Sequence, residues 1–166
     1  MKYGISGTHL PANFPFAVTF NMIAGTKGFF PCVLGAVAWE ETLKVLTPAQ
    51  AMPYISSDNG HGIFQLTDSW PKDWQVPSSS AAYACDDYLL PALKQWTTQT
   101  TLQGDDLIRA VAATYNAGWQ NAWDGHLNGN VDEYTTNQDY GTRVLADYHT
   151  LVAGLIPAGV SNPNPS

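Results

Sequence analysis

The stretch PCVLGAVAWEETLKVL, residues 31–46, decides how this chain folds. It is strongly apolar and carries two adjacent glutamates, Glu40 and Glu41. Pro31 suits the first turn of a helix, where the N–H group that proline lacks would have no partner anyway. Pro48 marks the end of the segment, because the residue before a proline disfavours helical backbone. The stretch therefore predicts a helix over residues 31–46 that carries two carboxyl groups.

The two glutamates differ in their helical neighbours. Glu40 has Lys44 four residues later, the orientation that favours an ion pair, so we expect Glu40 on a solvated face. Glu41 has these apolar neighbours at helical spacing: Leu34, Val37, Ala38 and Val45. A carboxyl group on an apolar face has a raised pKa, because desolvation disfavours the anion, and a protonated glutamate can act as the general acid of glycosidic cleavage. The alternative is that both glutamates lie at the edge of a solvent-facing strip.

The rest of the chain predicts a mostly α-helical single domain. Residues 1–30 are expected to form a loop-rich lead-in with a short helix near 16–24, residues 31–156 the main body, and residues 157–166 a disordered tail. Within the body, the pattern predicts a small irregular or β lobe near 54–80, a helix over 80–99 capped by Ser79 or Ser80, a helix from Gly104 to Gly118, a loop over 119–135 and a last helix over 138–155.

Composition narrows the classes of function. The 166 residues carry a net charge of -7, and only 13% of them are charged, against 12% that are aromatic. A surface of neutral polar and aromatic side chains suits sugars. The acidic balance and the lack of a basic stripe argue against nucleic acid and against anionic membrane surfaces.

The sequence shows neither a membrane span nor a secretory leader. No apolar run approaches the ~20 residues of a span, and the stretch MKYGISGTHLPANF lacks the apolar centre of a signal peptide. We therefore expect a protein made in the cytoplasm that is released by another route.

The cysteines and histidines predict no metal site. Cys32 and Cys85 form no C-x-x-C pair, and the four histidines are scattered, so no zinc spacing exists and no cofactor is expected. Both cysteines are expected to be small buried apolar residues, with a single disulfide as the alternative.

A glycine-rich stretch, SSDNGHGIFQLT, occupies residues 56–67. Gly60 and Gly62 permit unusual backbone angles and a close approach to a ligand, and Gln65 offers a donor and an acceptor for sugar hydroxyl and amide groups. A plain turn would explain the stretch about as well.

Two later stretches also carry candidate binding residues. In AATYNAGW, residues 112–119, Tyr115 and Asn116 end a helix and can face a cleft. In EYTTNQDYGTRVLADY, residues 133–148, Tyr140 precedes an amphipathic turn. Taken alone, both tyrosines are equally consistent with core packing.

In this order, the four stretches resemble the lytic transglycosylase and goose-type lysozyme family. That family shows Glu-Ser, then Gly-Leu-Met-Gln, then Ala-Tyr-Asn-x-Gly, then a late tyrosine before a Val-Leu helix. The matching residues here are Glu41-Thr42, Gly62-Ile63-Phe64-Gln65, Thr114-Tyr115-Asn116-Ala117-Gly118 and Tyr140. The resemblance covers roughly residues 31–150, with threonine in place of the usual serine.

The resemblance implies a lysozyme-like, mostly α fold of the α+β kind, whose cleft holds peptidoglycan glycan strands. It implies that Glu41 protonates the oxygen between N-acetylmuramic acid and N-acetylglucosamine, and then activates the muramic C6 hydroxyl to close a 1,6-anhydro ring. The implied substrate-binding residues are Thr42, Gly62, Ile63, Phe64, Gln65, Tyr115, Asn116 and Tyr140. A monomer without metal or cofactor, released like a phage endolysin by a virion or a lysis partner, is expected.

Two alternatives stay open. A hydrolytic muramidase would use water and, if inverting, needs a second carboxylate ~6.5–9.5 Å from the acid. Asp58 is the best candidate, although an aspartate beside Asn-Gly is also a common turn former. A catalytically silent glycan-binding module on the same fold is the other alternative.

Overall fold

The apolar stretch at residues 31–46 forms the central helix of the protein. The computed structural model describes residues 1–159 of the chain. Helix α2 (Pro31–Ala38) begins at Pro31, as predicted, and every one of its residues is buried. It continues without a break into η1 (Trp39–Leu43), a π-helical turn in which the Lys44 amide donates to the Trp39 carbonyl five residues earlier. The helix predicted over residues 31–46 is therefore confirmed as far as Leu43, and its second half is wider than an α-helix.

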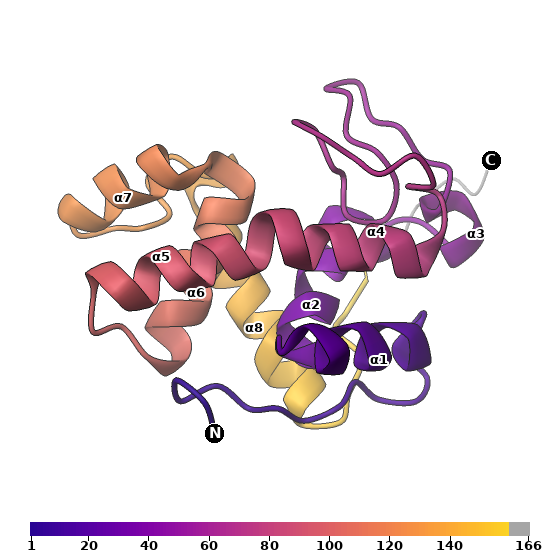
Figure 1. Ribbon diagram of the computed structural model, residues 1–166, viewed down its shortest axis with the longest axis horizontal. Coiled ribbons are helices and arrows are strands. Elements are labelled where there is room, and N and C mark those ends of the chain that lie inside the picture. Colours follow the sequence, from indigo (N-terminus) through magenta and orange to yellow (C-terminus); the bar gives the residue numbers. More distant parts are fainter. Residues whose placement is uncertain (160–166) are drawn as a thin grey trace.

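Helices from both ends of the chain pack around α2. The first is α1 (Ala17–Lys27), which is longer than the predicted short helix and ends at Gly28 in the left-handed conformation. The others are α8 (Tyr140–Val152), which packs on α2, and α6 (Gly104–Ala117), which packs on α8 (Figure 1). The predicted end of α6 at Gly118 is confirmed, with φ 84° at that glycine.

A long helical rod crosses the molecule in front of this bundle (Figure 1). It consists of α4 (Pro77–Tyr83), a π-helical stretch η2 (Ala84–Leu89) and α5 (Leu90–Gln99). The predicted start, with Ser79 or Ser80 as the cap, is wrong. Pro77 occupies the first turn instead, Ser79 bonds Asp73 at 2.5 Å, and Ser80 is buried.

A helix occupies part of the predicted loop over residues 119–135. Helix α7 (Trp119–Leu127) packs its aromatic residues on Trp96 of α5. The residues involved are Trp119, Trp123 and His126, spaced by four and three positions. This spacing is helical, and it is the signal that the prediction of a loop over residues 119–135 missed.

The segment between α3 (Pro48–Ala51) and α4 is irregular and rises above the rod, opposite α7 (Figure 1). Its pairing is limited to isolated bridges that join His61 to Ile55 and to Leu66. No β-strand forms within residues 1–159, so the lobe is irregular rather than a β-sheet.

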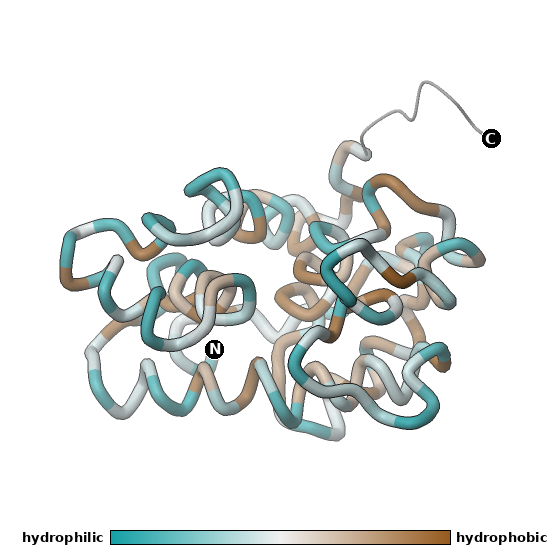
Figure 2. The backbone as a smooth tube through the Cα atoms, turned by 90° about the horizontal axis from the view of Figure 1, so that it is seen from above, coloured by the Kyte–Doolittle hydropathy of each residue, from teal (hydrophilic) through white to brown (hydrophobic). Residues whose placement is uncertain are grey.

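The described residues form one compact, mostly helical domain, with 57% of them in helices. Hydrophobic positions concentrate on its central segments and hydrophilic ones on its outer turns (Figure 2). Cys32 and Cys85 are buried free thiols, so the disulfide alternative is wrong. No helix within residues 1–159 combines the length and the apolar character that crossing a membrane requires. Of the predicted disordered tail, residues 160–166 lie outside the described part.

Candidate active site

Glu41 lies at the wall of a polar cavity of about 160 Å³. The residues that line this cavity are Glu41, Asp58, Gln65, Thr67, Tyr115 and Asn116. They come from η1, from the irregular segment and from the end of α6. The fold thus brings together Glu41, Gln65, Tyr115 and Asn116, which three separate stretches of the sequence supplied as candidates.

The pKa of the Glu41 carboxyl group lies close to neutral pH. Burial raises its pKa to about 7, while the hydrogen bond from Tyr140 lowers it and the charges of Glu40 and Asp58 raise it again. Near neutral pH, both the protonated and the ionised forms of Glu41 are therefore populated. A carboxyl group in this state can both donate and accept a proton.

Tyr140 orients Glu41. The tyrosine is the first residue of α8, its ring is buried, and its hydroxyl donates a hydrogen bond to Oε1 of Glu41. Burial and the Glu41 charge raise the pKa of Tyr140 well above its usual range, so the hydroxyl stays a donor. The candidate acid is therefore held in one position by a donor from the other end of the chain.

The start of α8 is anchored by Asp132, whose carboxylate is buried. It accepts hydrogen bonds from the Gly141 amide at 2.6 Å and from the Thr142 amide at 3.0 Å, and Arg109 pairs with it at 3.3 Å. Sequence analysis did not single out Asp132, since nothing local distinguishes it from the neighbouring acids. Its role depends on partners nine and ten residues later.

Two hydrogen bonds attach the irregular segment to the helices beside Glu41. The hydroxyl of Thr42 donates to the Ile63 carbonyl at 2.8 Å, and the hydroxyl of Tyr115 donates to the Phe64 carbonyl. Thr42, Ile63 and Phe64 are themselves buried, with side chains in the core. The structure therefore places these three predicted binding residues behind the cavity wall, where they position it.

The two glycines of this segment, Gly60 and Gly62, allow other groups of the protein to approach the backbone closely. A side chain on Gly60 would lie 2.4 Å from Oε1 of Gln65, and one on Gly62 would lie 3.0 Å from the Trp74 carbonyl. Gly62 also has a positive φ of 68°, and its carbonyl accepts a hydrogen bond from Gln65 at 2.9 Å. The sequence predicted that these glycines would let a ligand approach closely. In the structure they instead let groups of the irregular segment approach one another, which places Gln65 at the cavity.

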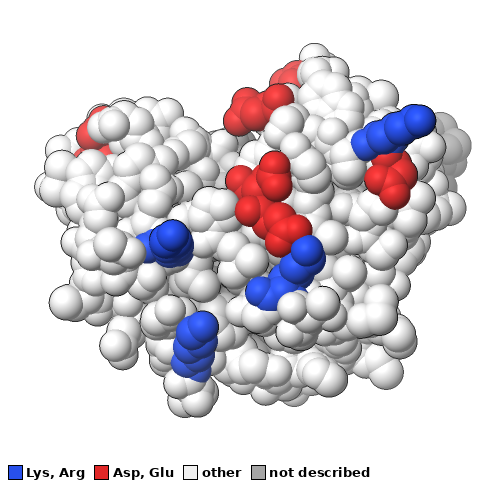
Figure 3. Space-filling view, in the orientation of Figure 1, with Lys and Arg blue, Asp and Glu red and all other residues white. Residues whose placement is uncertain are grey.

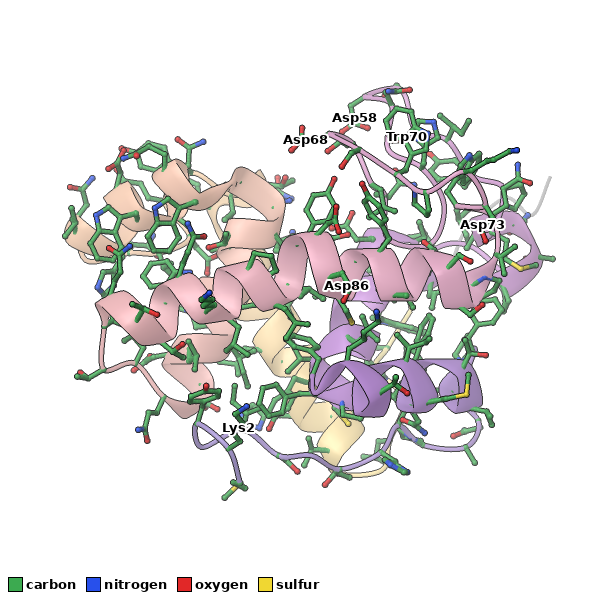
Figure 4. All side chains as sticks on the ribbon, in the orientation of Figure 1. Lys2, Asp58, Asp68, Trp70, Asp73 and Asp86 are labelled. Atoms are coloured by element: carbon green, nitrogen blue, oxygen red, sulfur yellow. The ribbon has the colours of Figure 1, made fainter. Side chains whose placement is uncertain are left out.

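Asp58 lies at the cavity and also in a turn. It is exposed, accepts a hydrogen bond from Ser56, and raises the pKa of Glu41 through its charge. Asp58 and Asp68 lie at the edge of the irregular segment that faces α7 (Figure 4). Both interpretations of Asp58 from the sequence, as a turn former and as a second carboxylate near Glu41, are therefore compatible with its position.

Glu40 does not lie on a solvated face, contrary to the prediction. Its side chain is only 6% exposed, and Oε2 accepts from Lys44 and from Arg143 of α8, each at 2.5 Å. Val45, predicted to share an apolar stripe with Glu41, is 43% exposed. Arg143 from α8 covers Glu40, whereas Val45 follows the π-helical turn, whose extra residue rotates it away from its α-helical position.

Asp147 of α8 completes a buried charge cluster behind Glu41. Burial and the neighbouring Glu40 carboxylate raise the pKa of Asp147, and its Oδ2 is buried without a hydrogen-bond partner. Arg143 also pairs with Asp139 at 2.9 Å. Sequence analysis missed this cluster, because it joins η1 to α8 over about a hundred residues.

A second cavity of about 470 Å³ adjoins the first. Thr67, Tyr115 and Asn116 line both, so the two form one groove. It continues along the rod to Trp119 at the start of α7, and the residues that line only this part include Asp68, Ser69, Asp87, Tyr88, Gln95 and Trp119. The space-filling view shows a hollow between the α7 lobe and the irregular segment, with acidic side chains beside it (Figure 3). An extended ligand in the groove could contact the irregular segment, the rod and the end of α6.

No metal site accompanies this groove: within residues 1–159, no group of three or more suitable side chains is placed to hold an ion. His61 stacks on Trp70 at 3.8 Å between ring centroids, and its Nδ1 lies 2.8 Å from the Asn59 carbonyl.

A scan against protein-family models and a search of curated proteins found no match for the chain.

Proposed function

We propose that this protein cleaves the β-1,4 bond between N-acetylmuramic acid and N-acetylglucosamine in peptidoglycan. One observation carries the proposal: Glu41 is a desolvated carboxyl, with a pKa raised to about 7, at the wall of an open polar groove. A general acid for a glycosidic bond needs such a pKa, and a glycan chain needs such a groove. The order of the four sequence stretches supports the same assignment and a lysozyme-like fold.

The mechanism begins with protonated Glu41. It donates its proton to the bridging oxygen as the bond from that oxygen to the muramic C1 breaks, and positive charge develops at C1. Glu41, now ionised and stabilised by Tyr140, accepts the proton of the muramic C6 hydroxyl. The C6 oxygen bonds to C1 and closes the 1,6-anhydro ring. No water is consumed, and Glu41 ends protonated again.

A hydrolytic muramidase is the second candidate, and the position of Asp58 favours it. This carboxylate lines the same cavity as Glu41 and could activate a water molecule on the opposite face of the sugar. Ser56 already donates a hydrogen bond to Asp58, which holds it in its turn. We place transglycosylation first, because Glu41 alone is poised for both of its proton transfers.

A delivery route follows from the same proposal. A wall-cleaving monomer of this kind would act outside the cytoplasm after release, in the manner of a phage endolysin. Expression of this chain without a lysis partner should then leave the host cells intact, whereas lysis on expression alone would contradict this route.

The test is digestion of purified peptidoglycan with product analysis by mass spectrometry. The wild type should yield anhydromuramic ends, and Glu41→Gln should lose on the order of 100- to 10,000-fold in rate. Glu133→Gln is the matched control, because Glu133 bonds Asn128 and lines neither part of the groove.

Other products would change the assignment. Reducing muramic ends, together with a severe loss in Asp58→Asn, would establish the hydrolase. Binding to peptidoglycan without any product would mean a glycan-binding module. Full activity in Glu41→Gln would refute the proposed acid.

A further inference from the structure

Among the described residues, acidic side chains and no basic ones line the long part of the groove, toward α7. We propose that it selects β-1,4 glycans with free amino groups, which carry positive charge, over fully N-acetylated ones. This inference rests on the proposed function and names the class of glycan that the same groove prefers. It concerns the walls beyond Glu41 rather than the bond-breaking step.

The walls of the groove carry acidic groups and no basic ones. Asp68 and Asp87 line the long part, on opposite elements, while Glu41 and Asp58 line the short part. No lysine, arginine or histidine is among the described residues that line either part. A ligand in the groove therefore meets negative charge only.

The groove carboxylates are also free of ion pairs. Asp86, next to Asp87 in sequence, pairs with Lys27 at 2.5 Å outside the groove. Asp68 and Asp87, by contrast, form no ion pair within residues 1–159. Their charge is thus available to a ligand.

Aromatic side chains give a second, independent reason to expect a cationic sugar. Trp119 and Tyr88 both line the long part and are partly exposed there. An aromatic face attracts the apolar face of a sugar ring, and it also attracts an ammonium group through the negative charge above the ring. Gln95 and Asn116 add amide groups that can bond hydroxyls. An amino sugar combines the ring, the hydroxyls and the cation that these walls match.

The size of the preference follows from the exposure of the two aspartates. Each lies on the surface, so one ammonium–carboxylate contact is worth little in water and is screened by salt. Two such contacts together predict roughly a fivefold gain in affinity at low salt. An N-acetyl group is neutral and gains nothing from them.

The experiment compares two defined probes, hexa-β-1,4-glucosamine and its fully N-acetylated form, by titration calorimetry at pH 6. The protein is the full chain carrying Glu41→Gln, so that neither probe is cleaved. The test variant adds Asp68→Asn and Asp87→Asn. The matched control instead adds Asp86→Asn and Asp105→Asn, which change the net charge equally but lie outside the groove.

We expect the glucosamine hexamer to bind roughly fivefold more tightly at 50 mM salt. The advantage should vanish at 500 mM salt and in the Asp68 and Asp87 variant, and it should persist in the control. Equal affinities, or an advantage that survives in the groove variant, would overturn the inference and leave the proposed function standing. Failure of both hexamers to bind would overturn the inference alone, because digestion of peptidoglycan decides the proposed function separately.

Discussion

Tyr140 donates a hydrogen bond to the carboxylate of Glu41 across 99 residues of sequence. The bond joins the first turn of α8 to the π-helical end of the central helix. It acts on Glu41 in opposition to burial, since it lowers the pKa that burial raises. The balance between the two sets how readily Glu41 releases its proton.

Removal of the Tyr140 hydroxyl should change the pH profile of cleavage. In Tyr140→Phe the buried ring remains, but the hydrogen bond that lowers the pKa of Glu41 is lost. We expect the alkaline limb of kcat to move to higher pH, and the rate at the optimum to fall about tenfold, because a hydrogen bond to a charged group is lost. An unshifted alkaline limb would show that Tyr140 does not tune Glu41.

Glu41→Gln should make the protein more stable at alkaline pH while abolishing cleavage. The folded pKa of about 7 lies above the ordinary value of 4.5, so ionisation of Glu41 opposes folding. Stability from the protonated form is present below pH 4.5 and is lost as the pH rises through 7. Glutamine avoids this loss, and we expect a gain of about 1–2 kcal/mol at pH 8 and none at pH 4.

Denaturant unfolding of both proteins at the two pH values checks this expectation, with Glu133→Gln as the control for a solvated carboxyl. A variant less stable than wild type at pH 8 would mean that the Glu41 anion is well solvated in the folded state.

Asp147→Asn should change stability in the same direction as Glu41→Gln. Burial and the Glu40 carboxylate raise the pKa of Asp147, so its ionisation also opposes folding. The variant should gain at least about 1 kcal/mol at pH 9, and the gain should shrink toward zero below pH 4. Thermal unfolding as a function of pH measures it, and Asp124→Asn on α7 serves as a control that should show no such trend. A stability difference that did not vary with pH would show that the raised pKa of Asp147 beside Glu40 is not its cause.

Thr42→Val should weaken the link between η1 and the irregular segment. It deletes the hydroxyl that bonds the Ile63 carbonyl at 2.8 Å, and leaves that buried acceptor without a partner. We expect a loss of about 1–3 kcal/mol in unfolding free energy. Thr42→Ser keeps the hydroxyl and should lose much less. A Thr42→Val variant as stable as the wild type would show that this hydrogen bond does not stabilise the link.

The central part of the fold was predictable from local signals. The proline at position 31 and the apolar run after it define α2, and the pattern that ends at Gly118 defines α6. Helix α7 was missed, because its aromatic residues are separated by polar ones and pack on Trp96, far away in sequence. Of the two forms predicted for the lobe near residues 54–80, irregular or β, the structure shows the irregular one, since glycine-rich turns occur with or without strands.

The sequence identified several residues of the candidate site, but not the role that each one plays. Glu41 and Tyr115 were identified from the sequence, and both line the cavity. The pair of Glu40 with Lys44 was predicted correctly, but the burial of Glu40 was not, because its second partner, Arg143, lies 103 residues away. Thr42 was expected to face a ligand, whereas its single hydrogen bond turns it toward the core.

The π-helical turn at Trp39–Leu43 constrains how this chain can vary between relatives. An α-helix accommodates one residue fewer per turn, so deletion of any single residue there would restore regular winding. The deletion would swing Glu41 away from Tyr140 and Glu40 away from Arg143 in one event. Single substitutions in this turn can therefore be tolerated, but an insertion or a deletion within it cannot. In any natural variant that keeps the contacts of Glu41 with Tyr140 and of Glu40 with Arg143, the spacing between Pro31 and Lys44 should be invariant even where the residues between them differ.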